Sequence, residues 1–186
     1  MPVKESSDHT DPNSAATARE VVLRDGAKRT FGDYAALAIA TWGVGYFPIA
    51  PGTWGSLVGV GIFLLLQQLR IKLKTGSAGA VAIGMDALWV AIYLVVILVI
   101  SLAGVWAATR VEAMSGRKDP GIVVADEVAG QLITLLVVPI FGAGIPWLMI
   151  FTGFMLFRLF DIWKPYPIRR LEGLESGLGV MADDIL

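Results

Sequence analysis

The residues best able to do chemistry in this sequence are two adjacent carboxylates, Asp126 and Glu127, at the start of an apolar segment over 123–138. Ionised groups beside a helix at membrane depth cost free energy and indicate a functional site. Adjacent helical residues point about 100° apart, so one carboxylate could bind a metal ion while the other orients a water molecule or acts as a base. The structural alternative is that acidic residues simply favour the positive end of the helix dipole.

A second group consists of Arg158, Asp161 and Lys164. Their three-residue intervals place them on one face of a helix. A buried face with two cations and a carboxylate favours phosphate binding by the cations. The alternative is an anchor at the membrane surface, where aromatic and basic side chains gather.

A third feature is the segment 48–56, which contains two prolines and two glycines. It predicts the start of a helix with Thr53 at the N-cap. The N–H groups and the dipole at such an end attract anions such as phosphate. Two other interpretations remain open: a plain break between two membrane helices, and a notch for helix packing at Gly55 and Gly59.

The last group is the acidic pair Asp183 and Asp184, which follows a glycine-rich stretch near the end of the sequence. Composition alone favours a polar tail, whereas the preceding Gly-Val-Met (179–181) favours a helix start. Carboxylate oxygens suit Mg²⁺, which is held by one or two carboxylates plus substrate phosphate. Acidic groups and cations that converge on one membrane face would form a stronger case than any cluster alone.

The residues that are missing or rare narrow the chemistry further. There is no cysteine, and the single histidine, His9, lies in a polar N-terminal stretch. These counts argue against a thiolate nucleophile, a histidine-dependent triad, a phosphohistidine intermediate and a histidine-rich zinc site. The net charge of −1 gives no bulk attraction for nucleic acid, so we expect no nucleic-acid partner.

The elements that must position these residues are apolar helices. Hydrophobic residues make up 55% of the 186, and charged residues only 17%. Residues 41–69 and 128–157 carry no charge, and Asp86 is the only charged residue in 76–109. Such runs are typical of membrane-embedded helices. We therefore predict an all-α, membrane-embedded bundle with broken or short helices over 34–47, 54–73, 85–109, 123–138 and 146–161, and a charged loop over 110–120.

The order of these helices predicts where the candidate groups meet. If 54–73 and 85–109 cross in opposite directions, the loop over 110–127 returns to the face that holds 48–56. A hairpin around Pro139 and Pro146 would bring the segment after Phe160 to that face as well. Only Arg70, Lys72 and Lys74 fall on the other face, so the positive-inside rule makes the shared face cytoplasmic. The basic residues on the shared face are Arg24, Lys28, Arg29, Arg110, Arg117, Lys118, Arg158, Lys164, Arg169 and Arg170.

Four motifs in this order resemble the phosphatidylglycerophosphatase A family, and the resemblance runs from about residue 31 to the end. They are Pro-x-Ala-Pro-Gly-Thr-Trp-Gly-Ser-Leu (48–57), Asp-Glu-Val-x-Gly-Gln (126–131), Phe-Arg-x-Phe-Asp-Ile-x-Lys-Pro-x-Pro-Ile-Arg (157–169) and Gly-x-Gly-Val-Met-x-Asp-Asp-Ile (177–185). The resemblance implies an all-helical, Mg²⁺-dependent lipid phosphatase of the bacterial inner membrane. Its substrate would be phosphatidylglycerophosphate and its product phosphatidylglycerol.

This resemblance leads to a hypothesis for each residue. Thr53, Ser56 and nearby N–H groups would bind the phosphate together with Arg158, Lys164 and Arg169. Three carboxylates would hold Mg²⁺, whose positive charge lowers the pKa of bound water. Glu127 or Asp161 would be the base, or Asp161 the nucleophile, with Lys164 also in the catalytic group. The expected Mg²⁺ ligands are Asp126, Asp183 and Asp184.

The resemblance also predicts the division of the chain and leaves two other functions open. We expect a disordered cytoplasmic tail over 1–30 and one phosphatase domain over 31–186. Family members continue with a last hydrophobic helix, which we expect to be missing after Leu186. The alternatives are a non-catalytic membrane protein, such as a small transporter with broken helices, and a lipid phosphotransferase. The sequence does not indicate an oligomeric state.

Overall fold

The computed structural model describes residues 29–74, 79–117, 120–138 and 147–163, and these contain helices and no strand. The all-α prediction is therefore confirmed. The predicted N-terminal tail up to residue 28 and the segment 164–186 lie outside the described residues. The helices are α2 (Phe31–Thr41), α3 (Pro51–Lys74), α4 (Gly79–Ser115), α5 (Ala125–Leu135) and α7 (Trp147–Trp163).

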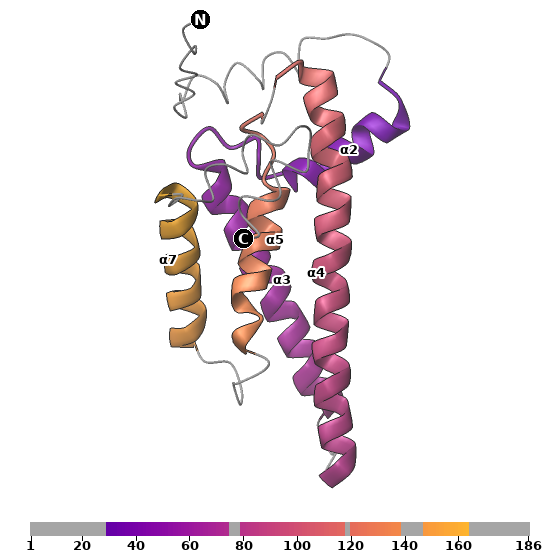
Figure 1. Cartoon of the computed structure of the whole chain (residues 1–186), viewed down its shortest axis with the longest axis vertical. Coiled ribbons are helices and arrows are strands. Elements are labelled where there is room, and N and C mark those ends of the chain that lie inside the picture. The colour runs from indigo at the N-terminus through magenta and orange to yellow at the C-terminus, as the bar shows by residue number, and fades with distance from the viewer. Residues whose placement is uncertain (1–28, 75–78, 118–119, 139–146, 164–186) are drawn as a thin grey trace, which may run out of the picture.

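The four helices α3, α4, α5 and α7 run up and down beside one another, as Figure 1 shows. The first residues of α3 and α5 lie at the same end as the last residues of α4 and α7. We call this the site end, and the opposite end, where α3 leads into α4, the hairpin end. The arrangement confirms the prediction that 48–56, the loop before α5 and the end of α7 share one face.

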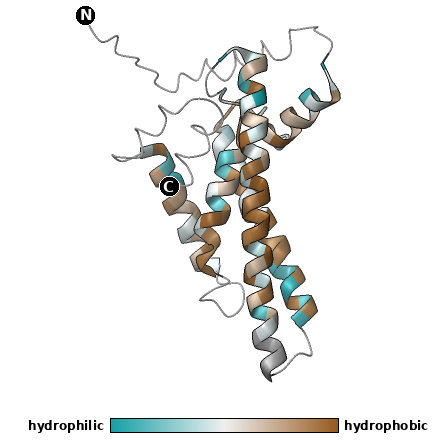
Figure 2. Ribbon diagram, turned by 45° about the vertical axis from the view of Figure 1, so that its right-hand side comes forward, coloured by the Kyte–Doolittle hydropathy of each residue, from teal (hydrophilic) through white to brown (hydrophobic). Residues whose placement is uncertain are grey.

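Two of the helices are long and apolar enough to cross a membrane: α3, and residues 84–115 of α4. Only 22% and 17% of their apolar windows are buried inside the protein, so most of these side chains face outward. Figure 2 shows hydrophobic residues along most of α4. A helix whose exposed surface is apolar is favoured in lipid rather than in water. With 11 and 17 residues, α5 and α7 are shorter than the roughly 20 residues of a full span.

Several helix boundaries differ from the prediction. The helix α3 begins at Pro51 rather than at residue 54, because proline fits the first helical position, where no N–H is needed. The predicted loop over 110–120 is wrong in its first half, since α4 continues to Ser115. It stops at Gly116, whose φ of 65° lies in the left-handed region. The helix α2 ends at Thr41 rather than at residue 47, because Trp42 takes a φ of 47°.

Close packing between α3 and α5 depends on two glycines of α3. A Cβ on Gly55 would lie 2.8 Å from the Cβ of Val124, and one on Gly59 would lie 3.0 Å from the Cβ of Gln131. Their lack of side chains allows the two helices to approach, as small residues do in membrane proteins. The packing notch predicted at Gly55 and Gly59 therefore acts within one chain.

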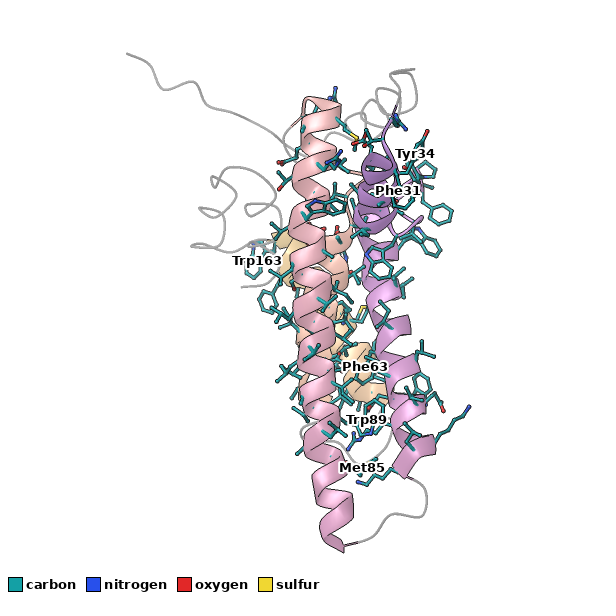
Figure 3. The ribbon with its side chains drawn as sticks, turned by 90° about the vertical axis from the view of Figure 1, so that its right-hand side faces the viewer. Phe31, Tyr34, Phe63, Met85, Trp89 and Trp163 are labelled. Carbon is teal, nitrogen blue, oxygen red and sulfur yellow. The ribbon has the colours of Figure 1, made fainter. Side chains whose placement is uncertain are left out.

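The core below this contact is apolar and joins four helices. Phe63 of α3, Tyr93 of α4, Leu132 of α5 and Ile150 of α7 are all buried in one cluster. The rings of Phe63 and Tyr93 meet edge to face with centroids 6.0 Å apart, and Figure 3 labels Phe63. The Tyr93 hydroxyl donates to the carbonyl of Leu132 at 2.9 Å, which ties α4 to the last turn of α5. This core fixes the relative positions of the helices that carry the candidate site.

Ion pairs join helices at both ends of the bundle. At the hairpin end, Asp86 of α4 accepts from Arg70 Nη2 at 2.7 Å and from Lys74 Nζ at 2.6 Å. We call these three residues the hairpin cluster. At the site end, Asp33 of α2 accepts from Arg110 Nε of α4 at 2.7 Å. The aromatic residues Phe31 and Tyr34 of α2 are exposed on the outer side of the bundle (Figure 3).

Candidate functional site

The two adjacent carboxylates lie in the first turn of α5, at the site end. The N–H of Val124, the residue before α5, donates to the carbonyl of Ala40 at 2.8 Å and so ties the start of α5 to α2. Asp126 is only 9% exposed, and Glu127 is half-buried. The backbone therefore holds both carboxylates where charge is poorly solvated, as expected of functional groups.

Glu127 and Arg158 meet at Gly52, where α3, α5 and α7 come together. A Cβ on Gly52 would collide with Glu127 Oε1 and would lie 3.0 Å from Arg158 Nη1. The glycine thus leaves space that two functional side chains fill from two other helices. Glu127 and Arg158 follow Gly52 by 75 and 106 positions in the sequence, and the fold brings all three together.

The guanidinium of Arg158 also forms an ion pair with Asp161, one turn further along α7. The two side chains are 15% and 12% exposed, so the pair is largely shielded from water. Arg158 Nε is buried and has no hydrogen-bond acceptor within the described part of the chain. The predicted common face of Arg158 and Asp161 is confirmed, whereas Lys164 lies outside the described residues.

Glu127, Arg158 and Asp161 around Gly52 form what we call the site cluster. It contains one guanidinium and two carboxylates in a half-buried position at the end of the bundle. A guanidinium offers several N–H donors in a plane that matches phosphate oxygens. A carboxylate next to bound phosphate can accept a proton from an attacking water molecule. The arrangement is therefore suited to phosphate ester hydrolysis.

The two hydroxyl residues of α3 differ in part from the prediction. Thr53 is not an N-cap, because α3 begins at Pro51 and the N–H groups of Thr53 and Trp54 both donate to the carbonyl of Ala50. Those two N–H groups are engaged within the helix rather than directed at an anion. Ser56 is fully buried, and its hydroxyl donates to the carbonyl of Gly52 at 3.0 Å. Phosphate binding by Thr53 and Ser56 stays a prediction.

A family model described as phosphatidylglycerophosphatase A matches residues 37–186. The chain belongs to this family. The matched range includes the whole of the site cluster and every residue that we predicted for the site. The family assignment made from the four motifs is thus confirmed.

Curated relatives agree with this membership. The chain is 36% identical over 146 residues to phosphatidylglycerophosphatase A of Haemophilus influenzae and 34% identical over 146 residues to that of Escherichia coli. It is 39% identical over 145 residues to a putative phosphatidylinositol-3-phosphatase of Bacteroides thetaiotaomicron. Each alignment covers 78% of this chain and, in the same order, 76%, 72% and 80% of the relative. No solved structure gives a significant match.

The described residues supply only part of the site that the family resemblance implies. Asp126, Glu127, Arg158 and Asp161 lie at the site end, whereas four other predicted residues lie outside the described range. Within the described segments, no group of three or more acidic or histidine side chains is placed to hold a metal ion. The Mg²⁺ site stays a prediction, as do the roles of Lys164, Arg169, Asp183 and Asp184.

Two residues of this family member were not predicted for the site. The place of Gly52 between Glu127 and Arg158 follows only from the crossing of α3, α5 and α7. Gln131 is fully buried at the contact of α5 with α3, and neither atom of its amide has a hydrogen-bond partner within the described residues. Gln131 ends the Asp-Glu-Val-x-Gly-Gln motif, and its four-residue spacing from Glu127 puts both side chains on the same helix face.

Proposed function

We propose that this protein is a Mg²⁺-dependent lipid phosphatase that converts phosphatidylglycerophosphate into phosphatidylglycerol in the bacterial inner membrane. Family membership supports phosphatase chemistry, and the names of the Haemophilus and Escherichia relatives support this substrate. The observation that carries the proposal is the meeting of Glu127 and Arg158 at Gly52. This point lies at one end of helices that are long and apolar enough to cross a membrane.

Phosphate binding is assigned first to Arg158. Its guanidinium sits between the carboxylates of α5 and α7, and its buried Nε has no acceptor among the described residues. Because hydrolysis of a phosphate ester depends mainly on positioning and charge neutralisation, a shielded arginine contributes strongly. Lys164, Arg169, Thr53 and Ser56 complete the phosphate-binding group in this proposal.

Glu127 is assigned as the proton acceptor. Glu127 reaches the point at Gly52 where Arg158 also lies, so it would stand beside a phosphate bound by that arginine. In the proposed step, water oxygen bonds to phosphorus while the bond between phosphorus and the glycerol oxygen breaks. One proton passes from the water to Glu127, which releases it to solvent, and the departing glycerol oxygen takes up a proton from solvent. The alternative is attack by Asp161 itself, followed by hydrolysis of the phospho-aspartate.

The carboxylate at the start of α5 is the kind of ligand that Mg²⁺ binds. Asp126 offers hard carboxylate oxygens in a buried position, and Mg²⁺ is bound by one or two carboxylates together with substrate phosphate. We propose that Asp126 holds the ion together with Asp183 and Asp184. When bound, Mg²⁺ would supply positive charge that stabilises the phosphoryl group as its bond breaks.

We further propose that the site end faces the cytoplasm. Arg110, Arg117 and Arg158 lie toward this end, whereas Arg70, Lys72 and Lys74 lie at the hairpin end. The orientation rests on the whole sequence, in which most basic residues flank the site-end segments. A cytoplasmic site would meet a lipid substrate on the inner leaflet.

The deciding experiment measures phosphate release by the purified chain in detergent micelles that contain phosphatidylglycerophosphate. We expect turnover with Mg²⁺, loss of turnover with EDTA, and loss of turnover in Asp126→Asn. Product analysis should show phosphatidylglycerol and inorganic phosphate, whereas a phosphotransferase would move the phosphate to a second alcohol. Full activity of Asp126→Asn would contradict the proposed metal ligand, and absence of lipid turnover would contradict the enzyme assignment.

One observation favours a second substrate, phosphatidylinositol 3-phosphate. The Bacteroides relative, which is named for that lipid, is 39% identical to this chain. Both lipids carry a phosphate monoester at the membrane surface, so Arg158 could bind either. The ratio of kcat/KM for the two lipids, measured in the same micelles, separates them. We expect kcat/KM to be higher for phosphatidylglycerophosphate. A higher value for phosphatidylinositol 3-phosphate would make that lipid the proposed substrate.

A further inference from the structure

The side of α2 that faces away from the bundle is aromatic, whereas its charged residue faces inward. Phe31 is 90% exposed and Tyr34 is 59% exposed, and both lie on the outer side of the bundle in Figure 3. Asp33, the one charged residue of α2, pairs instead with Arg110 of α4 at 2.7 Å. A helix on the surface of a water-soluble protein has its charged residues on the outer face. The reversed distribution in α2 indicates that its outer face meets an apolar environment.

More aromatic residues are exposed just after α2. Trp42, Phe47 and Trp54 all present part of their rings to the outside. The rings of Phe47 and Trp54 lie with their centroids 5.1 Å apart, so the segment between α2 and α3 is held against the first turn of α3. No residue from 34 to 69 is charged. Tryptophan and tyrosine are enriched where a membrane meets water, because their rings are apolar at one end and polar at the other.

The position of α2 along α4 agrees with the thickness of a membrane. Asp86 and Arg110 are the charged residues at the two ends of the apolar run of α4, and they are 24 positions apart. At the rise of an α-helix this separation is about 36 Å, whereas the hydrocarbon layer of a membrane is about 30 Å thick. Arg110, and the helix that pairs with it, therefore lie just beyond the hydrocarbon. Figure 1 shows that α2 runs across α4 rather than along it, as a helix in the plane of the membrane surface would.

We propose that α2 and the segment that joins it to α3 lie in the headgroup layer of one leaflet, with the exposed aromatic rings among the lipids. Lipid is a better occupant of this surface than a second copy of the chain, because the surface lies at the depth where α4 leaves the hydrocarbon. The N–H of Val124 donates to the carbonyl of Ala40, so α2 also fixes the depth of the first turn of α5, which carries Glu127. This placement takes α4 as crossing the membrane and is independent of the reaction.

The experiment measures the depth of single spin labels on the full chain in vesicles of phosphatidylcholine and phosphatidylglycerol. The chain has no cysteine, so one introduced cysteine gives one labelled position. Phe31→Cys and Tyr34→Cys report on α2. The matched references are Leu98→Cys, on the exposed middle of α4, and Ala113→Cys, exposed on α4 beyond Arg110. Depth follows from collisions of each label with oxygen, which concentrates in lipid, and with a nickel chelate, which stays in water.

We expect the labels on α2 to give collision rates between those of the two references. Ala108 packs against α2 and lies ten residues beyond Leu98, so the label at Tyr34 should lie about 15 Å nearer the membrane surface than the label at Leu98. The label at Ala113 should collide most often with the nickel chelate. Each substitution replaces an exposed side chain, so the thermal midpoint should stay at the wild-type value in all four variants.

Four results would overturn the proposal. Collision rates at Phe31 and Tyr34 equal to those at Ala113 would place α2 in water, and rates equal to those at Leu98 would place it in the hydrocarbon. Protection of both labels from both reagents, or magnetic coupling between the labels of two chains, would show that protein covers this surface instead of lipid. A label at Leu98 that meets mainly the nickel chelate would show that α4 does not cross the membrane.

Discussion

The site cluster and the hairpin cluster use the same kinds of residue at opposite ends of the bundle, and they differ in how fully their charges are satisfied. In the hairpin cluster, each oxygen of Asp86 accepts from a different cation, and the carboxylate is 39% exposed. In the site cluster, Arg158 forms an ion pair with Asp161 whose side chains are 15% and 12% exposed, and Glu127 reaches the same point at Gly52. Arg158 keeps a buried N–H with no acceptor among the described residues.

This difference in satisfied hydrogen bonds separates charged residues that stabilise the fold from charged residues that can take part in a reaction. Two cations around one exposed carboxylate are a complete set that water can also solvate, and such pairs contribute little beyond joining helix ends. A shielded arginine with spare donor capacity costs free energy to assemble, and it can recover that cost by binding an anion. Charge type does not distinguish the two clusters, and neither does burial of the arginine, since Arg70 is 14% exposed; the exposure of the carboxylate and the unused hydrogen-bonding capacity do.

The largest difference in activity between the two clusters is expected when the arginine is removed from each. Arg158→Met should lower kcat/KM for phosphatidylglycerophosphate by about 10³-fold, because a cation that neutralises phosphate during transfer contributes at least that much. Arg70→Met should leave kcat/KM within about twofold, since Arg70 lies at the opposite end of the bundle from the site cluster. Both are measured as phosphate release in the same micelles.

Loss of Arg158 also leaves the shielded carboxylate of Asp161 without its cation, so loss of folding must be separated from loss of chemistry. The double variant Arg158→Met with Asp161→Leu replaces the whole ion pair by apolar residues, a change that buried pairs tolerate well. We expect it to keep the wild-type thermal midpoint within a few degrees and to stay inactive. Activity in the double variant would show that the site cluster is structural, like the hairpin cluster.

A second pair of variants tests the space at Gly52. Gly52→Ala would push aside the ends of Glu127 and Arg158, which are flexible and can move at low cost to stability. We expect about a tenfold to hundredfold loss of kcat with little change in the thermal midpoint, because misplaced reacting groups cost rate. Gly61→Ala is the matched control, since a Cβ there meets nothing within 4 Å. Equal activities of the two variants would contradict a catalytic role for this point.

Most of the fold could be predicted from the sequence, because apolar runs longer than a membrane span allow few arrangements. The order of turns around 48–56, 110–127 and 139–146 then brought three motifs to one end. Boundaries were harder to predict. The end of α4 at Ser115 depends on Gly116, whereas the sequence before it contains charged residues that resemble a loop. Charged residues are compatible with a helix where that helix extends beyond its apolar, membrane-spanning part.

The site was predicted in its residue types but not in its contacts. Asp126, Glu127, Arg158 and Asp161 stood out because charges are rare in apolar segments. The role of Gly52 and the burial of Gln131 depend on how α3 crosses α5, and no local pattern specifies a crossing. The same limit explains Thr53, whose assignment as an N-cap failed when proline took the first helical position.

A smaller effect is expected from the hairpin cluster when its carboxylate is neutralised. Asp86→Asn leaves Arg70 and Lys74 with a weaker acceptor, so the bond between the ends of α3 and α4 is weakened. We expect a loss of about 1 kcal/mol in the free energy of unfolding, typical of a partly exposed pair, and unchanged kcat/KM. Denaturant unfolding in detergent measures the first, and phosphate release the second. A large loss of activity would contradict the structural interpretation of this end.

The smallest effect concerns Asp33, which lies at the site end but outside the site cluster. The backbone N–H and the hydroxyl of Thr30 donate to its carboxylate, as does Arg110, and these bonds lower the pKa of Asp33 to about 2. Because the folded pKa lies below the ordinary value of 3.8, the stabilisation is complete above about pH 4 and is lost as the pH falls through about 2. The difference in thermal midpoint between wild type and Asp33→Asn should stay constant from pH 7 to about 5 and shrink between about 4 and 2. Measuring the difference cancels the titration of other acids. A full-sized difference at pH 2 would show that α2 is held to α4 without an ionised Asp33. A loss of phosphate release at pH 7 in Asp33→Asn would show instead that Asp33 serves the reaction, as the residues of the site cluster do.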